Sequence, residues 1–320
     1  MIKKILLIII VIILLAIAGG YIYLTVSFPK VSPITDLKVN ITPERFERGK
    51  YLVENVTNCF VCHSPRDYSR YSAPYLIETK GAGNKTDFTK NKGLPGNLYP
   101  GNITPSTLKS WTDGELLRAI TEGVSKDGRA LFPIMPYLNY GKMDKEDIYS
   151  IIAYIRSIRS IESNIPKTEI DFPMNIITNT LPTPAKFQKV PAKIDKFNYG
   201  RYLVNAASCN DCHTQKNKGK PLEGMKYAGG FKFILNDGSE LFSSNITPHK
   251  ETGIGSWSKE NFVKRFKDFS VPLNELPMVI NGGENTVMPW FDYAKMSEED
   301  LGAIYDYLSQ QEAVDYKVPE

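Results

Sequence analysis

Cysteine and histidine are scarce in this sequence, with only four and three residues among 320. All four cysteines and two of the three histidines lie in two short stretches, residues 59–63 and 209–213. The remaining histidine, His249, stands alone, and we expect it at the surface. Because no cysteine is left over, thiol chemistry is confined to these two stretches.

The sequence also lacks an excess of charge of one sign. Its formal net charge of +4 includes Lys3 and Lys4, and without them 37 basic residues stand against 35 acidic ones. Nucleic-acid-binding domains usually show a clear basic excess. The near-neutral body therefore argues against nucleic acid as a partner, and 42% apolar with 23% charged residues is typical of a folded globular protein.

The two cysteine-containing stretches read Cys-Phe-Val-Cys-His and Cys-Asn-Asp-Cys-His. This CxxCH pattern is typical of covalent haem c attachment, in which both thiols add to the haem vinyl groups and the histidine binds the iron. We therefore predict two covalently bound haem c groups, with iron. The attachment residues are Cys59, Cys62, Cys209 and Cys212, and the iron ligands are His63 and His213.

A lone CxxC pair also occurs in thioredoxin-like proteins and in zinc sites. Thioredoxin-like motifs follow a strand in a β-α-β pattern, and the sequence shows no such pattern. Four cysteines and two histidines are enough for one zinc ion. However, the two clusters are 150 residues apart and each carries its histidine in the same place, which favours haem.

An uncharged apolar run extends from Ile5 to Val26. Its 22 residues would span about 33 Å as a helix, enough to cross a bilayer. Because Lys3 and Lys4 precede it, the positive-inside rule places the rest of the chain outside. An Ala-x-Ala sequence ending at Ala18 leaves a cleaved signal peptide as the alternative.

Continuation of the apolar run beyond Ala18 favours a retained transmembrane helix, so residues 1–28 are interpreted as a membrane anchor or signal segment. In both cases the body is exported. Haem c is attached on the outer side of the bacterial inner membrane, so we expect the soluble part in the periplasm, at the inner (cytoplasmic) membrane.

The surroundings of the two haem motifs repeat as well. A Gly-basic-Tyr-Leu-Val sequence precedes each motif, and Asn-Ile-Thr-Pro, a tryptophan and Met-Pro-aromatic follow it. The repeat predicts a mainly α-helical protein with two tandem cytochrome c domains, each of three to five helices around a covalent haem, after one N-terminal transmembrane helix. Their predicted bounds are 42–163 and 195–314. The proline-rich linker, 164–194, is expected to be extended and laid along both domains.

Each domain is predicted to contain the same helices. Thr42 is a candidate cap for the helix before the first haem motif. Thr112 and Glu115 form a capping box for the middle helix. The last helices are predicted at 144–160 and 297–310.

Glycines in the first helices suggest close helix packing. Gly49 and Gly200 occupy equivalent positions in the repeat. They would let an aromatic residue of the last helix approach closely, and Tyr154 and Tyr307 are the candidates.

Each iron needs a second axial ligand, and the repeat offers two pairs of methionines. Met143 and Met296 precede the start of a helix, where a hydrophobic staple explains them. Met135 and Met288 lie in loops, each followed by a proline and an aromatic residue, and a rigid loop suits a thioether ligand. We predict Met135 and Met288 as iron ligands. Packing against the haem as apolar residues is the alternative.

With these motifs the sequence resembles the class I cytochrome c superfamily. It is most similar to the multihaem cytochrome c subunits that serve membrane-bound alcohol and aldehyde dehydrogenases. The first domain carries the pattern in the Asn-Ile-Thr-Pro sequence at Asn102, in Trp111, in Glu-Gly-Val at Glu122, and in the segment from Phe132 through Met135.

The second domain departs from that pattern between Phe266 and Met288, where extra residues include Gly282 and Gly283. Those subunits usually carry three haems, whereas this chain has two motifs. The resemblance implies that an asparagine, a threonine and a tryptophan of each domain surround the haem propionates. Loop capping and core packing are the alternatives. The residues concerned are Asn102, Thr104, Trp111, Asn245, Thr247 and Trp257.

The predicted function is electron transfer, because haem with His and Met ligands has little vacant coordination chemistry. Expected partners are a dehydrogenase subunit, a quinol-oxidising complex or a terminal oxidase of the respiratory chain. We expect an electron-transfer protein or subunit of an oxidoreductase rather than an enzyme by itself. The alternative is a dihaem enzyme such as a peroxidase or a thiosulfate-oxidising cytochrome, although the latter needs a cysteine that this chain lacks. A haem-based sensor ranks last.

Overall fold

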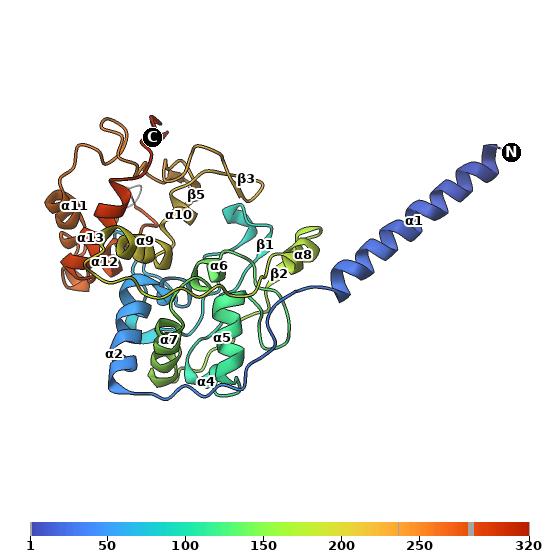
Figure 1. Cartoon of the computed structure of the whole chain (residues 1–320), viewed down its shortest axis with the longest axis horizontal. Helices are drawn as coiled ribbons and strands as arrows, with labels where there is room; N and C mark the ends of the chain where they lie inside the picture. The colour runs from blue at the N-terminus through green and yellow to red at the C-terminus, as the bar shows by residue number, and fades with distance from the viewer. Residues whose placement is uncertain (1, 236, 281–284, 320) are drawn as a thin grey trace.

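A computed structural model describes residues 2–235, 237–280 and 285–319. Within them the chain is mostly helical, as predicted. Helix α1 projects away from the body, which contains the other elements (Figure 1). The longer helices are α1 (Ile2–Val26), α2 (Pro43–Tyr51), α5 (Asp113–Glu122), α7 (Lys145–Ser157), α9 (Lys196–Ala206), α11 (Lys259–Lys267) and α13 (Glu298–Leu308).

Shorter elements connect these helices. Single helical turns are α3 (Cys59–Cys62), α4 (Pro105–Leu108), α6 (Tyr137–Tyr140), α8 (Met174–Ile177), α10 (Cys209–Cys212) and α12 (Trp290–Tyr293). A π-helical turn, Leu52–Val56, continues α2 toward the first haem motif. The strands form three antiparallel pairs: β1 (Gly96–Asn97) with β2 (Glu169–Ile170), β3 (Lys216–Asn217) with β4 (Lys220–Pro221), and β5 (Lys232–Ile234) with β6 (Glu240–Phe242).

Helix α1 is long and apolar enough to cross a membrane, and among the described residues it is the one helix that is. It has no buried residue, so the body contributes little to its stability. Its length and composition suit a membrane anchor and a signal sequence equally.

The predicted helix starts are confirmed. The Thr42 side chain accepts a hydrogen bond from the Arg45 N–H at the start of α2. Thr112 and Glu115 form both halves of a capping box at α5. The last helices start as expected but end early, at Ser157 and Leu308.

The early end of α7 has a local cause. Ile158 is extended, and three residues later the Ile161 carbonyl accepts hydrogen bonds from the side chains of Asn102 and Ser106. These bonds hold the chain away from the helix axis, so the helix does not continue to residue 160 as predicted.

The first and last helices of each half pack very closely. A Cβ atom at Gly49 would lie 1.9 Å from the Ser150 carbonyl oxygen, and one at Gly200 would lie 1.9 Å from that of Ala303. The same Cβ atoms would lie 2.8 and 3.0 Å from the Cβ atoms of the predicted partners, Tyr154 and Tyr307. The predicted close approach is therefore confirmed, although the nearest atom is a backbone carbonyl.

The linker is less extended than predicted, because it contains the helical turns α8 and Thr178–Thr180. Strand β2 is extended, as expected. Its later part lies along both halves as expected. The Ala185 N–H donates to the Glu122 carboxylate and the Val190 N–H to that of Asp144. Lys193 then pairs with Glu299 of the second half.

Candidate haem sites

The two CxxCH motifs have the same backbone geometry. Each CxxC sequence forms one helical turn, α3 or α10, which places its two cysteines on the same side. The residue before each turn, Asn58 or Ser208, is left-handed, with φ of 48° and 56°. His63 and His213 end the turns with nearly identical φ of −93° and −94°. Both motifs therefore present their side chains in the same way.

Both histidines are held in the tautomer that leaves Nε2 without a proton. Nδ1 of His63 lies 2.7 Å from the Gly101 carbonyl oxygen, and Nδ1 of His213 lies 2.8 Å from that of Ser244. Because a carbonyl accepts, each Nδ1–H donates and the Nε2 lone pair is left for a metal. Burial lowers the pKa of both imidazoles, which favours the neutral form that a ligand requires.

The carbonyls that orient the histidines directly precede the two Asn-Ile-Thr-Pro sequences. The side-chain oxygen of Asn102 accepts hydrogen bonds from the N–H and hydroxyl of Thr104. Asn245 makes the same two bonds with Thr247. The amide groups of both asparagines donate to the segment that follows the last helix of their half.

These hydrogen bonds favour the loop-capping alternative for the asparagines and threonines. Contact with haem propionates stays a prediction. The two tryptophans, Trp111 and Trp257, are partly buried against the core, and their carbonyls accept hydrogen bonds from Arg156 and Tyr305.

All four cysteines are free thiols. Burial raises the pKa of Cys59, Cys62 and Cys209, whereas Cys212 is exposed. Among the described residues, no group of three or more His, Cys, Asp or Glu side chains is placed to hold a metal ion.

The two pairs of methionines occupy different environments. Met143 and Met296 are fully buried in the apolar core. Met135 and Met288 lie at its edge and keep part of their surface exposed. The carbonyls of Met135 and Met288 each accept a hydrogen bond of 2.8 Å from the N–H two residues later, so both loops are tightly turned.

Each methionine loop is supported by the opposite half of the chain. The Ser72 hydroxyl donates to the Met288 carbonyl at 2.6 Å and accepts from the Trp290 N–H at 2.9 Å. On the other side, the Asn139 amide donates to Asp211, inside the second CxxCH motif, at 2.7 Å. No sequence pattern predicts these contacts, because they join loops far apart in the chain.

A reciprocal set of hydrogen bonds joins the halves elsewhere. Tyr51 of the first half donates to Asp300 of the second, and Tyr202 of the second donates to Asp147 of the first, both at 2.5 Å. The residues in each bond are repeat equivalents of those in the other. The tyrosine oxygens also accept N–H groups from Ser297 and Asp144 at the helix caps.

The extra segment of the second half also contacts the first half. Arg70 forms an isolated bridge with Met278 and donates to the carbonyls of Asn274 and Leu276. The extra segment, in which the second half departs from the repeat, therefore helps to join the two halves. Gly282 and Gly283, noted in the same segment, lie outside the described residues.

His249 reaches the surface as expected, although it is partly buried, with 24% of its side chain exposed. Its Nδ1 lies 2.8 Å from the Thr252 hydroxyl and 3.8 Å from an Asp315 carboxylate oxygen. The Thr252 hydroxyl also accepts a hydrogen bond from the Tyr316 N–H of the C-terminal segment.

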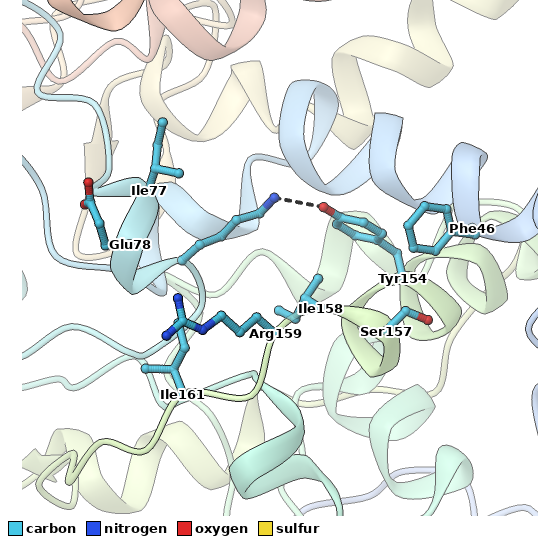
Figure 2. A pocket seen from close by; sticks show the side chains of 9 residues that line it. Phe46, Ile77, Glu78, Tyr154, Ser157, Ile158, Arg159 and Ile161 are labelled. Atoms are coloured by element: carbon cyan, nitrogen blue, oxygen red, sulfur yellow. Dashed lines mark hydrogen bonds between the residues drawn. The ribbon is translucent and has the colours of Figure 1, made fainter.

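A pocket of about 230 Å³ lies beside Tyr154 and is separate from the predicted site residues (Figure 2). Lys80 crosses it and donates to the Tyr154 hydroxyl at 2.8 Å. Both also bond to Glu54. The Lys80 ammonium, the Glu54 carboxylate and the Tyr154 hydroxyl satisfy one another's hydrogen-bonding capacity. The pocket is therefore interpreted as part of the packing around α7.

The donor set fits a c-type haem at each motif. Each motif offers two thiols one helical turn apart and an imidazole with Nε2 free. These features define a protein with two sites of c-type cytochrome character.

Comparison with known proteins supports that class. No protein-family model matches the chain. It is 30% identical over 238 residues to the fructose dehydrogenase cytochrome subunit of Gluconobacter japonicus, covering 69% of this chain and 44% of that protein. It is 24% identical over 284 residues to the alcohol dehydrogenase (quinone) cytochrome c subunit of Gluconobacter oxydans, covering 84% and 55%. It is 24% identical over 289 residues to the gluconate 2-dehydrogenase cytochrome c subunit of Pantoea cypripedii, covering 84% and 60%.

The chain is thus a distant homologue of the cytochrome c subunits of quinone-dependent dehydrogenases. It spans about half the length of these relatives.

Proposed function

We propose that this protein is a membrane-anchored dihaem c-type cytochrome. It carries electrons between a periplasmic or membrane redox enzyme and the respiratory chain. The observation that carries the proposal is the duplicated CxxCH turn in which Nδ1 of the histidine donates to a fixed backbone carbonyl. Bound haem would supply a one-electron redox centre at each site.

In this proposal the two halves are cytochrome c domains, 42–163 and 195–314. His63 and Met135 hold the first iron, and His213 and Met288 hold the second. The edge position of the ligand methionines supports this choice, since fully buried Met143 and Met296 would have to leave the core to reach an iron.

The contact between the halves supports direct exchange of electrons between the two sites. Asn139 of the first half donates hydrogen bonds to Ser208 and Asp211, beside and within the CxxCH motif of the second half. The reciprocal bonds of Tyr51 and Tyr202 fix the relative orientation of the halves. A fixed orientation keeps the separation of the two sites constant. The proposed relay therefore runs inside one chain.

The first test is the number of covalent haems. The denatured protein should keep its haem, and its mass should exceed the 36.1 kDa polypeptide by two haem groups if α1 is retained. Intact-mass spectrometry and haem staining after denaturing electrophoresis measure both. Haem that extracts into acidified organic solvent would contradict the proposal. Loss of the segment up to Ala18 would separately reject the anchor.

The second test distinguishes an electron carrier from a dihaem enzyme. The purified chain should exchange electrons with a redox protein and turn over neither peroxide nor thiosulfate, because both irons have two protein ligands in this proposal. Stopped-flow reduction of peroxide and steady-state oxidation of thiosulfate check this. Rapid turnover of either substrate would favour the enzyme.

A further inference from the structure

The segment between α1 and the body is held to the protein surface. The Ser32 N–H donates to the Glu122 carboxylate, and the Val39 N–H donates to that of Asp113, both at 2.8 Å. Only residues 27–31 lie between the end of α1 at Val26 and the first of these bonds. Five extended residues reach at most about 18 Å. A body so tied cannot move far from a membrane that α1 spans.

The face of the body next to α1 belongs to the linker. Helix α8 and the turn Thr178–Thr180 contact α1, and α8 lies beside its C-terminal end in Figure 1. This is the end that carries Tyr21 and Tyr23, which are 55% and 54% exposed. Exposed tyrosines near the end of a membrane helix mark the level of the lipid headgroups.

Two large apolar side chains are exposed at or next to α8. Phe172, two residues before the helix, is 78% exposed, and Ile177, its last residue, is 42% exposed. Exposed apolar residues that gather on one surface indicate an interaction site. The continuation of this surface from α1 and the short reach of residues 27–31 identify the bilayer as what covers it.

We propose that residues 172–177 are a second membrane contact, in which Phe172 and Ile177 insert into the boundary between lipid headgroups and acyl chains. The inference rests on the retained anchor of the proposed function. With α1 as the first contact, this second one fixes how the body is oriented on the membrane. The surface carrying α8 then faces lipid, and the second half of the chain points away from it.

Spin labelling tests the proposal on the full chain in nanodiscs of phosphatidylcholine and phosphatidylglycerol. All four native cysteines lie in the haem motifs, so one introduced cysteine gives a unique labelling site. Phe172→Cys and, separately, Ile177→Cys carry a nitroxide. Ile194→Cys is the matched control, since Ile194 is 88% exposed and precedes α9, which lies across the body from α1 (Figure 1).

Power saturation of the nitroxide signal in the reduced protein compares how often the label collides with lipid-soluble oxygen and with a water-soluble nickel complex. We expect oxygen to dominate at positions 172 and 177 and nickel to dominate at 194, with haem content equal in all variants. Nickel dominating at all three positions in membrane-bound protein overturns the second contact and leaves the anchor intact. Recovery of the protein in the soluble fraction without detergent rejects the anchor, and the inference with it.

Discussion

Met135→Ala should open the first iron and lower its reduction potential. The thioether favours the ferrous state, so its removal shifts the potential downward, and carbon monoxide should then bind the reduced haem readily. Redox titration and the sulfur-to-iron charge-transfer absorption of the ferric protein measure the effect. That absorption should fall by half, because one of two equivalent bonds is lost.

Met143→Ala is the matched control. Met143 is fully buried, so its loss should cost about 2–5 kcal/mol of stability while leaving the haem spectrum intact. Met288→Ala and Met296→Ala should show the same contrast in the second half. Survival of the charge-transfer band in Met135→Ala, with its loss by half in Met143→Ala, would reverse the ligand assignment.

Gly49→Ala should destabilise the first half strongly. The new Cβ would lie 1.9 Å from the Ser150 carbonyl oxygen, and this atom cannot yield without separating α2 from α7. The cost should reach or exceed the upper end of the range of about 1–3 kcal/mol typical of overpacking. Gly200→Ala should destabilise the second half in the same way, because its new Cβ would lie 1.9 Å from the Ala303 carbonyl oxygen. Thermal unfolding followed by circular dichroism of the haem-loaded protein measures both.

Gly302→Ala provides the control for this prediction. Gly302 lies inside α13, and the nearest atom to its added Cβ is 3.5 Å away on the flexible Lys259 side chain. The substitution should stabilise the helix by about 0.5–1 kcal/mol, because alanine is the better helix former. A melting temperature for Gly49→Ala equal to that of Gly302→Ala would refute the close-packing argument.

Local features were predictable from the sequence wherever a short motif carries its own physical cause. The caps at Thr42 and Thr112 follow from side chains that satisfy nearby N–H groups. The pairing of Gly49 with the last helix followed from comparing the two repeats. Each of these depends on residues within a few positions or on the repeat itself.

Contacts between the halves were not predictable in this way. Ser72 supports the Met288 loop from 216 positions away, and serine in a loop has no distinguishing pattern. The end of α7 was misplaced for a similar reason, since Asn102 captures the Ile161 carbonyl from another part of the chain. The helical turn α8 was missed because prolines on both sides of it indicated an extended segment.

The reciprocal bonds of Tyr51 with Asp300 and of Tyr202 with Asp147 have the form of an isologous dimer interface, in which one surface meets a copy of itself. Here both copies belong to one polypeptide, so each always meets the same partner and the two can differ. The two halves differ at the residue four positions after the loop methionine, which is Asn139 in the first half and Asp292 in the second. Asn139 bonds to Asp211, whereas the buried carboxylate of Asp292 has no hydrogen-bond partner among the described residues. A true homodimer would have two equal sites. If each half holds a haem as proposed, fusion lets this chain hold two unequal ones.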